Sequence, residues 1–228
     1  MRLNSTLLVL TGVFVVVGLI LVVVVARPRS SNNRPINQSA APGEPATIAE
    51  AISSLTRVTP VTPPADRVTL IGGTLLTVEN AAVPKRIEQE VGLPVESRTK
   101  ENMTTVEGLA AATRVLTNPP KLMVVDLGRT DSGAGLSVSE TTAGLAALAA
   151  KAAQAGTVLV VVSGVGVDGN DQLAAIIKIA VGSRARLVDA SPLLLDANFR
   201  VNPSTLNVRG VDVLAAQLVT VLKELRGA

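Results

Sequence analysis

Short, mainly apolar segments alternate with amphipathic helical segments from Arg67 to Ala228, and this alternation limits the possible folds more than any other feature of the sequence. Apolar runs such as VLVVV at 158–162 are typical of strands buried on both faces of a parallel sheet. The pattern predicts an α/β domain with helices on both sides of that sheet. The expected strands are 68–71, 95–96, 122–127, 158–162 and 186–188, and the expected helices are 82–91, 105–116, 139–155, 171–181 and 210–225.

A single apolar segment near the N-terminus predicts a membrane anchor. From Leu7 to Val25 the chain has nineteen residues without a charge. At about 1.5 Å per residue this helix would be roughly 28 Å long, close to the thickness of the hydrocarbon layer. The segment exceeds the ~7–15 apolar residues of a cleaved signal peptide, so a retained signal anchor is favoured. We therefore expect one transmembrane helix within residues 1–26 that binds the lipid bilayer.

Residues 27–66 are rich in Pro, Ser, Asn and Thr and are expected to form a tether. Only the stretch from Ile48 to Leu55 has the pattern of a short helix. Because the tether has no longer apolar periodicity, residues 67–228 are expected to form the domain and to fold without it. The predicted organisation is thus an anchor at 1–26, a tether at 27–66 and one α/β domain at 67–228.

The composition excludes several classes of site. The chain has no His and no Cys, which removes a Ser-His-Asp triad, a Cys-His dyad, histidine-bound zinc and disulfides. No cluster of carboxylates has metal-ligand spacing, and no metal or cofactor is expected. After Asp66 there are sixteen basic and fifteen acidic residues, so the domain is nearly neutral. With no Trp or Tyr and only two Phe, nucleic acid is not an expected partner.

Three segments that follow predicted elements carry a resemblance to a known family. They are Gly72-Gly73-Thr74, Gly128-Arg129-Thr130-Asp131, and Asn202-x-x-Thr205 ahead of the last helix. In this order they resemble the sequence blocks of the SGNH (GDSL) hydrolase superfamily, the lipase and acylesterase-like domains. The resemblance covers residues 67–228 and implies a flavodoxin-like five-stranded parallel sheet in the order 2-1-3-4-5.

The family's functional positions are occupied by other residue types in this chain. The resemblance puts Thr74 at the position of the family's nucleophile, and it puts Asn102 and Thr130 at the positions of its oxyanion hole. It puts Asn202 and Thr205 where the family has the orienting aspartate and the catalytic histidine. A hydroxyl nucleophile needs a base, and none of these side chains supplies one. The expected protein is a catalytically inactive pseudoenzyme that acts as a binding or assembly module of a membrane-associated complex, with other proteins of that complex as its partners.

Two other functions remain open from the sequence. A divergent esterase acting through Thr74 would need a rebuilt acid–base system, for which Asp131 and Glu101 are candidates. Separately, Gly164, Gly166 and Gly169 form a GxGxxG pattern after a predicted strand, and Asp189 follows twenty residues later. This spacing is that of a dinucleotide-binding fingerprint, so a dinucleotide-binding module is the second alternative.

The charges beside the predicted anchor and the family resemblance predict opposite orientations in the membrane. Arg27, Arg29 and Arg34 follow the apolar segment whereas only Arg2 precedes it, which favours a cytoplasmic domain under the positive-inside rule. Anchored members of the family that the domain resembles are generally exported. We expect the domain to lie outside the cytoplasmic membrane.

Overall fold

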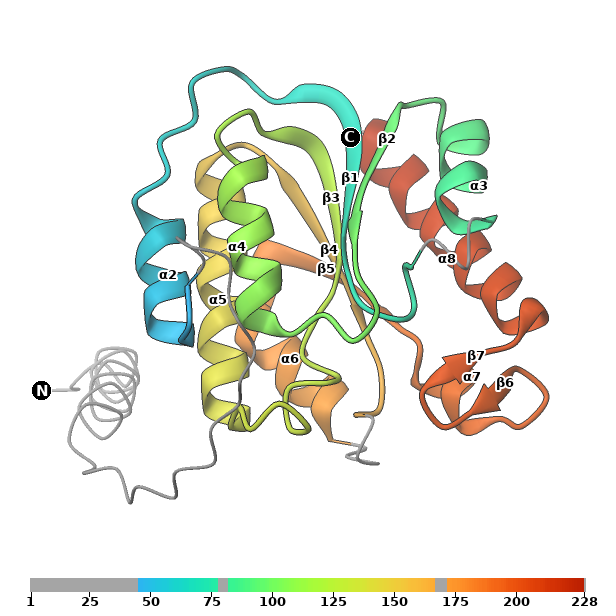
Figure 1. The fold of residues 1–228 in the computed structure, drawn as a ribbon. Helices are drawn as coiled ribbons and strands as arrows, with labels where there is room; N and C mark the ends of the chain where they lie inside the picture. The colour runs from blue at the N-terminus through green and yellow to red at the C-terminus, as the bar shows by residue number, and fades with distance from the viewer. Residues whose placement is uncertain (1–44, 78–81, 167–171, 228) are drawn as a thin grey trace, which may run out of the picture. The chain divides into compact units, whose positions relative to one another are not determined.

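The computed structural model describes residues 45–77, 82–166 and 172–227. Its centre is a five-stranded sheet in the order β2-β1-β3-β4-β5, and every neighbouring pair of strands is parallel (Figure 1). The predicted sheet and its order are confirmed. The strands are β1 (Ala65–Gly72), β2 (Val95–Thr99), β3 (Pro120–Asp126), β4 (Val158–Ser163) and β5 (Ala185–Asp189).

Helices cover both faces of the sheet (Figure 1). One face carries α3 (Ala82–Val91) and α8 (Val208–Gly227), and the other carries α4 (Thr105–Val115), α5 (Val138–Gln154) and α6 (Leu173–Val181). Smaller elements in the C-terminal half of the chain are η2 (Gly182–Arg184), α7 (Ser191–Leu195) and an antiparallel hairpin of β6 (Arg200–Asn202) and β7 (Thr205–Leu206).

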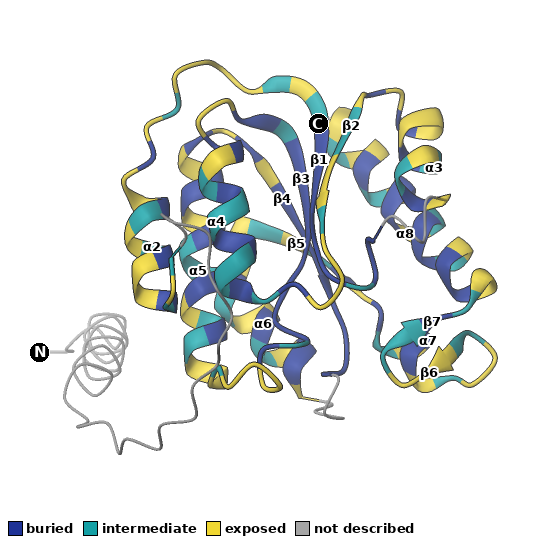
Figure 2. Ribbon diagram, viewed as in Figure 1, coloured by how far each residue is buried: buried dark blue, intermediate teal, exposed yellow. Residues whose placement is uncertain are grey.

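The central strands explain why the sequence pattern is apolar without interruption. Successive side chains of a strand point to opposite faces. In β3, Leu122 and Val124 therefore pack beneath α3 and α8, whereas Met123 and Val125 pack beneath α4 and α5. All four side chains have no exposed surface. Figure 2 shows β3 and β4 buried between helices whose outer sides are exposed.

A helix from the predicted tether belongs to the packed domain. Helix α2 (Ile48–Thr56) begins with a capping box, in which the Thr47 hydroxyl accepts from the backbone of Glu50 and the Glu50 carboxylate accepts from the backbone of Thr47. The helix lies on the outer side of α4 and α5, and its Ile48 and Leu55 side chains join their core. The structure thus extends the packed domain ahead of residue 67, because this short helix finds its apolar partners in a distant part of the chain.

Replacing Leu55 should show that α2 contributes to stability. The side chain of Leu55 is 0% exposed, so Leu55→Ala would leave a cavity and should lower the unfolding free energy by about 3 kcal/mol. Urea denaturation of the whole chain measures this change. Ser53→Ala, an exposed position on the same helix, is the control and should stay within about 0.5 kcal/mol of wild type. Equal stability of the two variants would mean that α2 is not part of the cooperative unit.

No helix among residues 45–77, 82–166 and 172–227 is long and apolar enough to span a membrane. The predicted span from Leu7 to Val25 lies outside the described residues.

Candidate functional site

The turn after β1 carries Thr74 and is held against the end of β3. The backbone N–H of Gly73 donates to the carbonyl of Asp126 over 2.9 Å, and the N–H of Leu75 donates to Asp126 Oδ2 over 2.9 Å. Because β1 and β3 are parallel neighbours, their carboxyl ends meet at one edge of the sheet. The structure therefore places Thr74, which is partly buried, at the position where ligands bind in sheets of this type.

The two predicted oxyanion-hole positions, Asn102 and Thr130, lie together. Thr130 Oγ1 is 3.0 Å from the carbonyl oxygen of Met103 and 3.4 Å from that of Asn102. The backbone of Asn102 has φ 53°, in the left-handed region that favours glycine and asparagine. This conformation fits the glycine that the resemblance implies there. A threonine hydroxyl has one proton to donate, and here it is directed at these chain carbonyls.

Asp131 holds structure together in this loop. Its Oδ1 accepts from the N–H of Thr105 over 2.8 Å, and its Oδ2 accepts from the Thr141 hydroxyl over 2.6 Å. The residue is 1% exposed and thereby joins the start of α4 to α5. Both carboxylate oxygens are occupied by these bonds, which does not favour Asp131 as a rebuilt catalytic base. Glu101, the other candidate, is exposed in the turn before α4.

The predicted acid and base positions pair with each other in the β6–β7 hairpin. Asn202 is opposite Thr205, and its Oδ1 accepts from both the backbone N–H and the hydroxyl of Ser204 at 2.9 Å. The Asn202 side chain therefore stabilises the hairpin turn. Where an aspartate would orient a base, the chain has a neutral amide engaged in local structure.

Arg129 is a residue of this site that sequence reasoning missed. It is 4% exposed, and its Nε donates to the carbonyl of Val165 over 3.1 Å while its Nη2 donates to that of Ser204 over 3.2 Å. One side chain thus connects the loop after β3 with the loop after β4 and with the hairpin. Its position in the Gly128–Asp131 segment was the only available signal, and the distant carbonyls it binds cannot be inferred from sequence.

Asp126 is the second missed residue. It ends β3 and is 2% exposed; its Oδ1 is buried and has no hydrogen-bond partner among the described residues. Burial raises the pKa of this carboxyl above its ordinary value, although the charge of Arg129 and the N–H of Leu75 act in the opposite direction. A carboxyl with a raised pKa therefore lies directly behind the turn that carries Thr74.

The raised pKa of Asp126 predicts a specific pH dependence. Between the unfolded value of about 3.8 and the higher folded value, the folded chain binds more protons than the unfolded chain. The unfolding free energy contributed by this group therefore falls as the pH rises through that window. Asp126→Asn removes the titration, so the stability of the variant relative to wild type should increase with pH. Urea denaturation at a series of pH values from about 4 to about 8 measures the difference, and a difference that stays constant would contradict the prediction.

The predicted dinucleotide fingerprint has structural roles where the structure describes it. A Cβ on Gly164 would lie 2.8 Å from Leu194 Cδ1, so packing alone accounts for a glycine there. Asp189 Oδ1 accepts from the N–H of Ser191 over 2.8 Å at the start of α7. Gly166 lines a small surface pocket of about 30 Å³, and Gly169 lies outside the described residues.

Within the described ranges, no three acidic residues are grouped closely enough to hold a metal ion. The arrangement at this edge of the sheet is therefore one of hydroxyls, amides, a buried arginine and a buried carboxyl.

The comparisons with known proteins concern the fold. No protein-family model and no curated protein matches the sequence. Among solved structures, a GDSL-like lipase from Bacteroides thetaiotaomicron is 15% identical with a TM-score of 0.58 and covers 78% of this chain and 98% of its own. The psychrotrophic esterase EstA from Pseudoalteromonas is 15% identical with a TM-score of 0.57 and covers 72% of this chain and 100% of its own. A family 3 carbohydrate esterase from Clostridium thermocellum is 15% identical, with a TM-score of 0.56 and coverages of 71% and 97%. The chain has an SGNH-hydrolase-like fold.

Proposed function

We propose that this chain is a membrane-anchored, non-catalytic protein with an SGNH-hydrolase-like domain, and that it acts as a binding or assembly module. The observation that carries the proposal is the absence of any histidine from a chain with an SGNH-hydrolase-like fold, where the family resemblance implies a catalytic histidine. A hydroxyl attacks an ester effectively only when a neighbouring base removes its proton. The counterpart of the base, Thr205, has a hydroxyl that does not accept protons near neutral pH.

The surroundings of the family positions support the same conclusion. Thr130 Oγ1 is bonded to the β2–α4 loop, and Asn202 is bonded to its own turn. Arg129 joins three segments at the edge where a substrate would bind. These contacts stabilise the loops of the former site and use the groups that would otherwise act on a substrate.

A second candidate function follows from Asp126. Its carboxyl lies beside the turn that carries Thr74, and the buried Oδ1 has no hydrogen-bond partner among the described residues. Burial raises the pKa of this carboxyl, and a carboxylate with a raised pKa can serve as a general base. An esterase with a threonine nucleophile and Asp126 in place of the missing histidine would be a divergent form of the family reaction. It requires a path for the ester to a carboxyl that is 2% exposed.

Covalent labelling separates the two candidates without depending on the choice of substrate. A fluorophosphonate probe reacts with a hydroxyl only where that hydroxyl is activated, so the wild-type chain should remain unlabelled. The divergent esterase would be labelled, and both Thr74→Ala and Asp126→Asn would abolish the label. Thr77→Ala, a hydroxyl in the same turn, is the matched control. Labelling lost in Thr74→Ala and kept in Thr77→Ala would overturn the non-catalytic assignment.

We also propose that the segment from Leu7 to Val25 anchors the chain in the bilayer and that the domain lies on the extracytoplasmic side. The length and apolarity of the segment support the anchor. The polar tether and the export of anchored proteins with related domains support the orientation. A reporter fused after Ala228 that is active only in the cytoplasm would reverse the orientation.

A further inference from the structure

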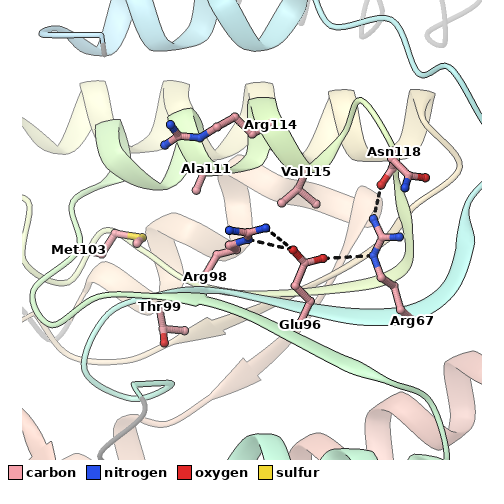
Figure 3. Close-up of a pocket in the computed structure, with 9 residues that line it drawn as sticks. All are labelled: Arg67, Glu96, Arg98, Thr99, Met103, Ala111, Arg114, Val115 and Asn118. Carbon is pink, nitrogen blue, oxygen red and sulfur yellow. Dashed lines mark hydrogen bonds and ion pairs between the residues drawn. The ribbon is translucent and has the colours of Figure 1, made fainter. Parts of the chain in front are cut away.

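A pocket of about 500 Å³ opens between strand β2 and helix α4, and Thr74 is not among the residues that line it (Figure 3). Its volume is in the range of pockets that hold small-molecule ligands, roughly 300–1,000 Å³. Residues from β1, β2 and α4 contribute to its lining. The ones that matter here are Arg67, Glu96, Arg98, Met103, Arg114 and Val115.

The lining is positively charged. Three arginines, Arg67, Arg98 and Arg114, and one carboxylate, Glu96, belong to the lining, so its basic side chains outnumber its acidic ones. Since two of these arginines come from neighbouring strands and the third from a helix, only the fold brings them together. Such concentration of one sign of charge in a concave site attracts anions.

Glu96 lies between two of the arginines and holds them in place (Figure 3). Arg98 donates to Glu96 Oε1 from Nη2 over 2.6 Å and from Nε over 2.9 Å, and Arg67 Nε is 3.4 Å from Glu96 Oε2. A guanidinium has five N–H donors, so the two bonds of Arg98 to Glu96 account for only part of its capacity. Glu96 thus orients donors that an incoming anion can use.

Arg67 has a donor whose hydrogen bond is incomplete. Its Nη2 donates to the carbonyl of Asn118, but its Nε is buried and its contact with Glu96 does not meet hydrogen-bond geometry. A buried N–H without a well-formed hydrogen bond costs free energy, so Glu96 and Asn118 do not fully satisfy Arg67. The side chain of Arg67 is 20% exposed, and this exposure belongs to atoms other than the buried Nε.

One part of the pocket is apolar. Met103 and Val115 are 7% exposed each, and Ala111 beside them is partly buried. A ligand that fits both parts combines an anionic group with a compact apolar group, as small organic ligands commonly do.

We propose that this pocket binds a small organic dianion, either a phosphate monoester or a dicarboxylate, with its apolar part against Met103 and Val115. A phosphate monoester carries about −1.5 to −2 charge at neutral pH, a sign that suits a lining rich in arginine. Guanidinium groups bind phosphate and carboxylate oxygens through paired N–H donors. The proposal does not depend on whether the chain hydrolyses esters.

Titration calorimetry of the whole 228-residue chain in an uncharged detergent tests the site. The probes are phenyl phosphate, phenylsuccinate and inorganic phosphate. Comparing the affinities of the first two shows whether the pocket prefers a phosphate monoester or a dicarboxylate. Saturable binding is expected for at least one of the two phenyl compounds. Phenyl phosphate should bind about tenfold more tightly than inorganic phosphate, because only the former reaches the apolar part.

Variants of the lining make the test specific. Arg98→Gln and Arg114→Gln should each weaken binding about tenfold or more. Arg186→Gln, an exposed arginine on β5 at the opposite edge of the sheet, is the matched control and should bind like wild type. Glu96→Gln should tighten binding several-fold, since the glutamine amide oxygen can still accept from Arg98 while the negative charge that competes with the ligand is gone.

Three results would overturn the proposal. They are the absence of saturable binding up to about 10 mM of every probe, equal weakening in Arg186→Gln and in the pocket variants, or weaker binding in Glu96→Gln. Thermal unfolding of each variant accompanies the titrations. If a variant loses binding but unfolds at the wild-type temperature, the loss is due to the changed pocket. If a glutamine variant unfolds at a lower temperature, the corresponding lysine variant, Arg98→Lys or Arg114→Lys, replaces it. The lysine variants should still weaken binding, because lysine lacks the paired N–H donors of arginine.

Discussion

The purified chain should hydrolyse short acyl esters such as 4-nitrophenyl acetate no faster than buffer, and Thr74→Ala should change nothing. Removing the base of a hydroxyl–base pair typically lowers the rate by a factor of about 10⁴ or more, and this chain has no histidine to supply one. Steady-state turnover with esters and thioesters of several chain lengths measures the result. Turnover well above buffer that disappears in Thr74→Ala would establish the divergent esterase instead.

Reversal of the substituted positions refines this prediction. Thr74→Ser alone should restore no activity, because the base would still be missing. The combination of Thr74→Ser, Asn202→Asp and Thr205→His should recover at most a trace. In that variant Thr130, which donates to the Met103 carbonyl, would still stand where the family has an asparagine amide. Full activity in the triple variant would mean that the loops already have the geometry of a competent site.

Gly72→Ala should destabilise the domain by about 4 kcal/mol or more, enough to unfold a domain of ordinary stability in part or in full. Gly72 is the last residue of β1 and pairs with Asp126 of β3. Its φ is +153°, and a Cβ there would lie 2.6 Å from the Asp126 carbonyl oxygen and 2.7 Å from its nitrogen. These are backbone atoms of the neighbouring central strand, so the clash is relieved only by separating β1 from β3. Urea denaturation of the whole chain measures the loss.

Gly135→Ala is the matched control for this variant. Gly135 also has a positive φ, +82°, but a Cβ there would meet no atom within 4 Å. The unfolding free energy of Gly135→Ala should therefore fall by only about 1 kcal/mol, the cost of holding an alanine in a left-handed backbone conformation. The difference between the two variants isolates the steric cost of the approach of β1 to β3. Equal losses would mean that the contact with Asp126 has little effect on stability.

The sheet and most of its helices could be predicted because the signals are local. Runs such as 122–125 and 158–162 are apolar throughout, since residues such as Leu122 and Met123 are buried against helices on opposite faces. The strand order came from the resemblance, and the structure confirms it. The same order brings the segments of Thr74, Asn102 and Thr130 to one edge of the sheet.

The alternation of apolar strands and amphipathic helices by itself determined that this chain forms a parallel α/β domain, and its lack of histidine determined which chemistry is unavailable. Only the tertiary structure decided that α2 packs on α4 and α5, that Arg129 joins three loops, and that Glu96 aligns Arg67 and Arg98 in a pocket. The physical reason is the separation in sequence between the residues that interact. Periodicity and capping act between residues a few positions apart, whereas Arg129 binds carbonyls 36 and 75 positions away and Arg67 pairs with Glu96 across 29 positions.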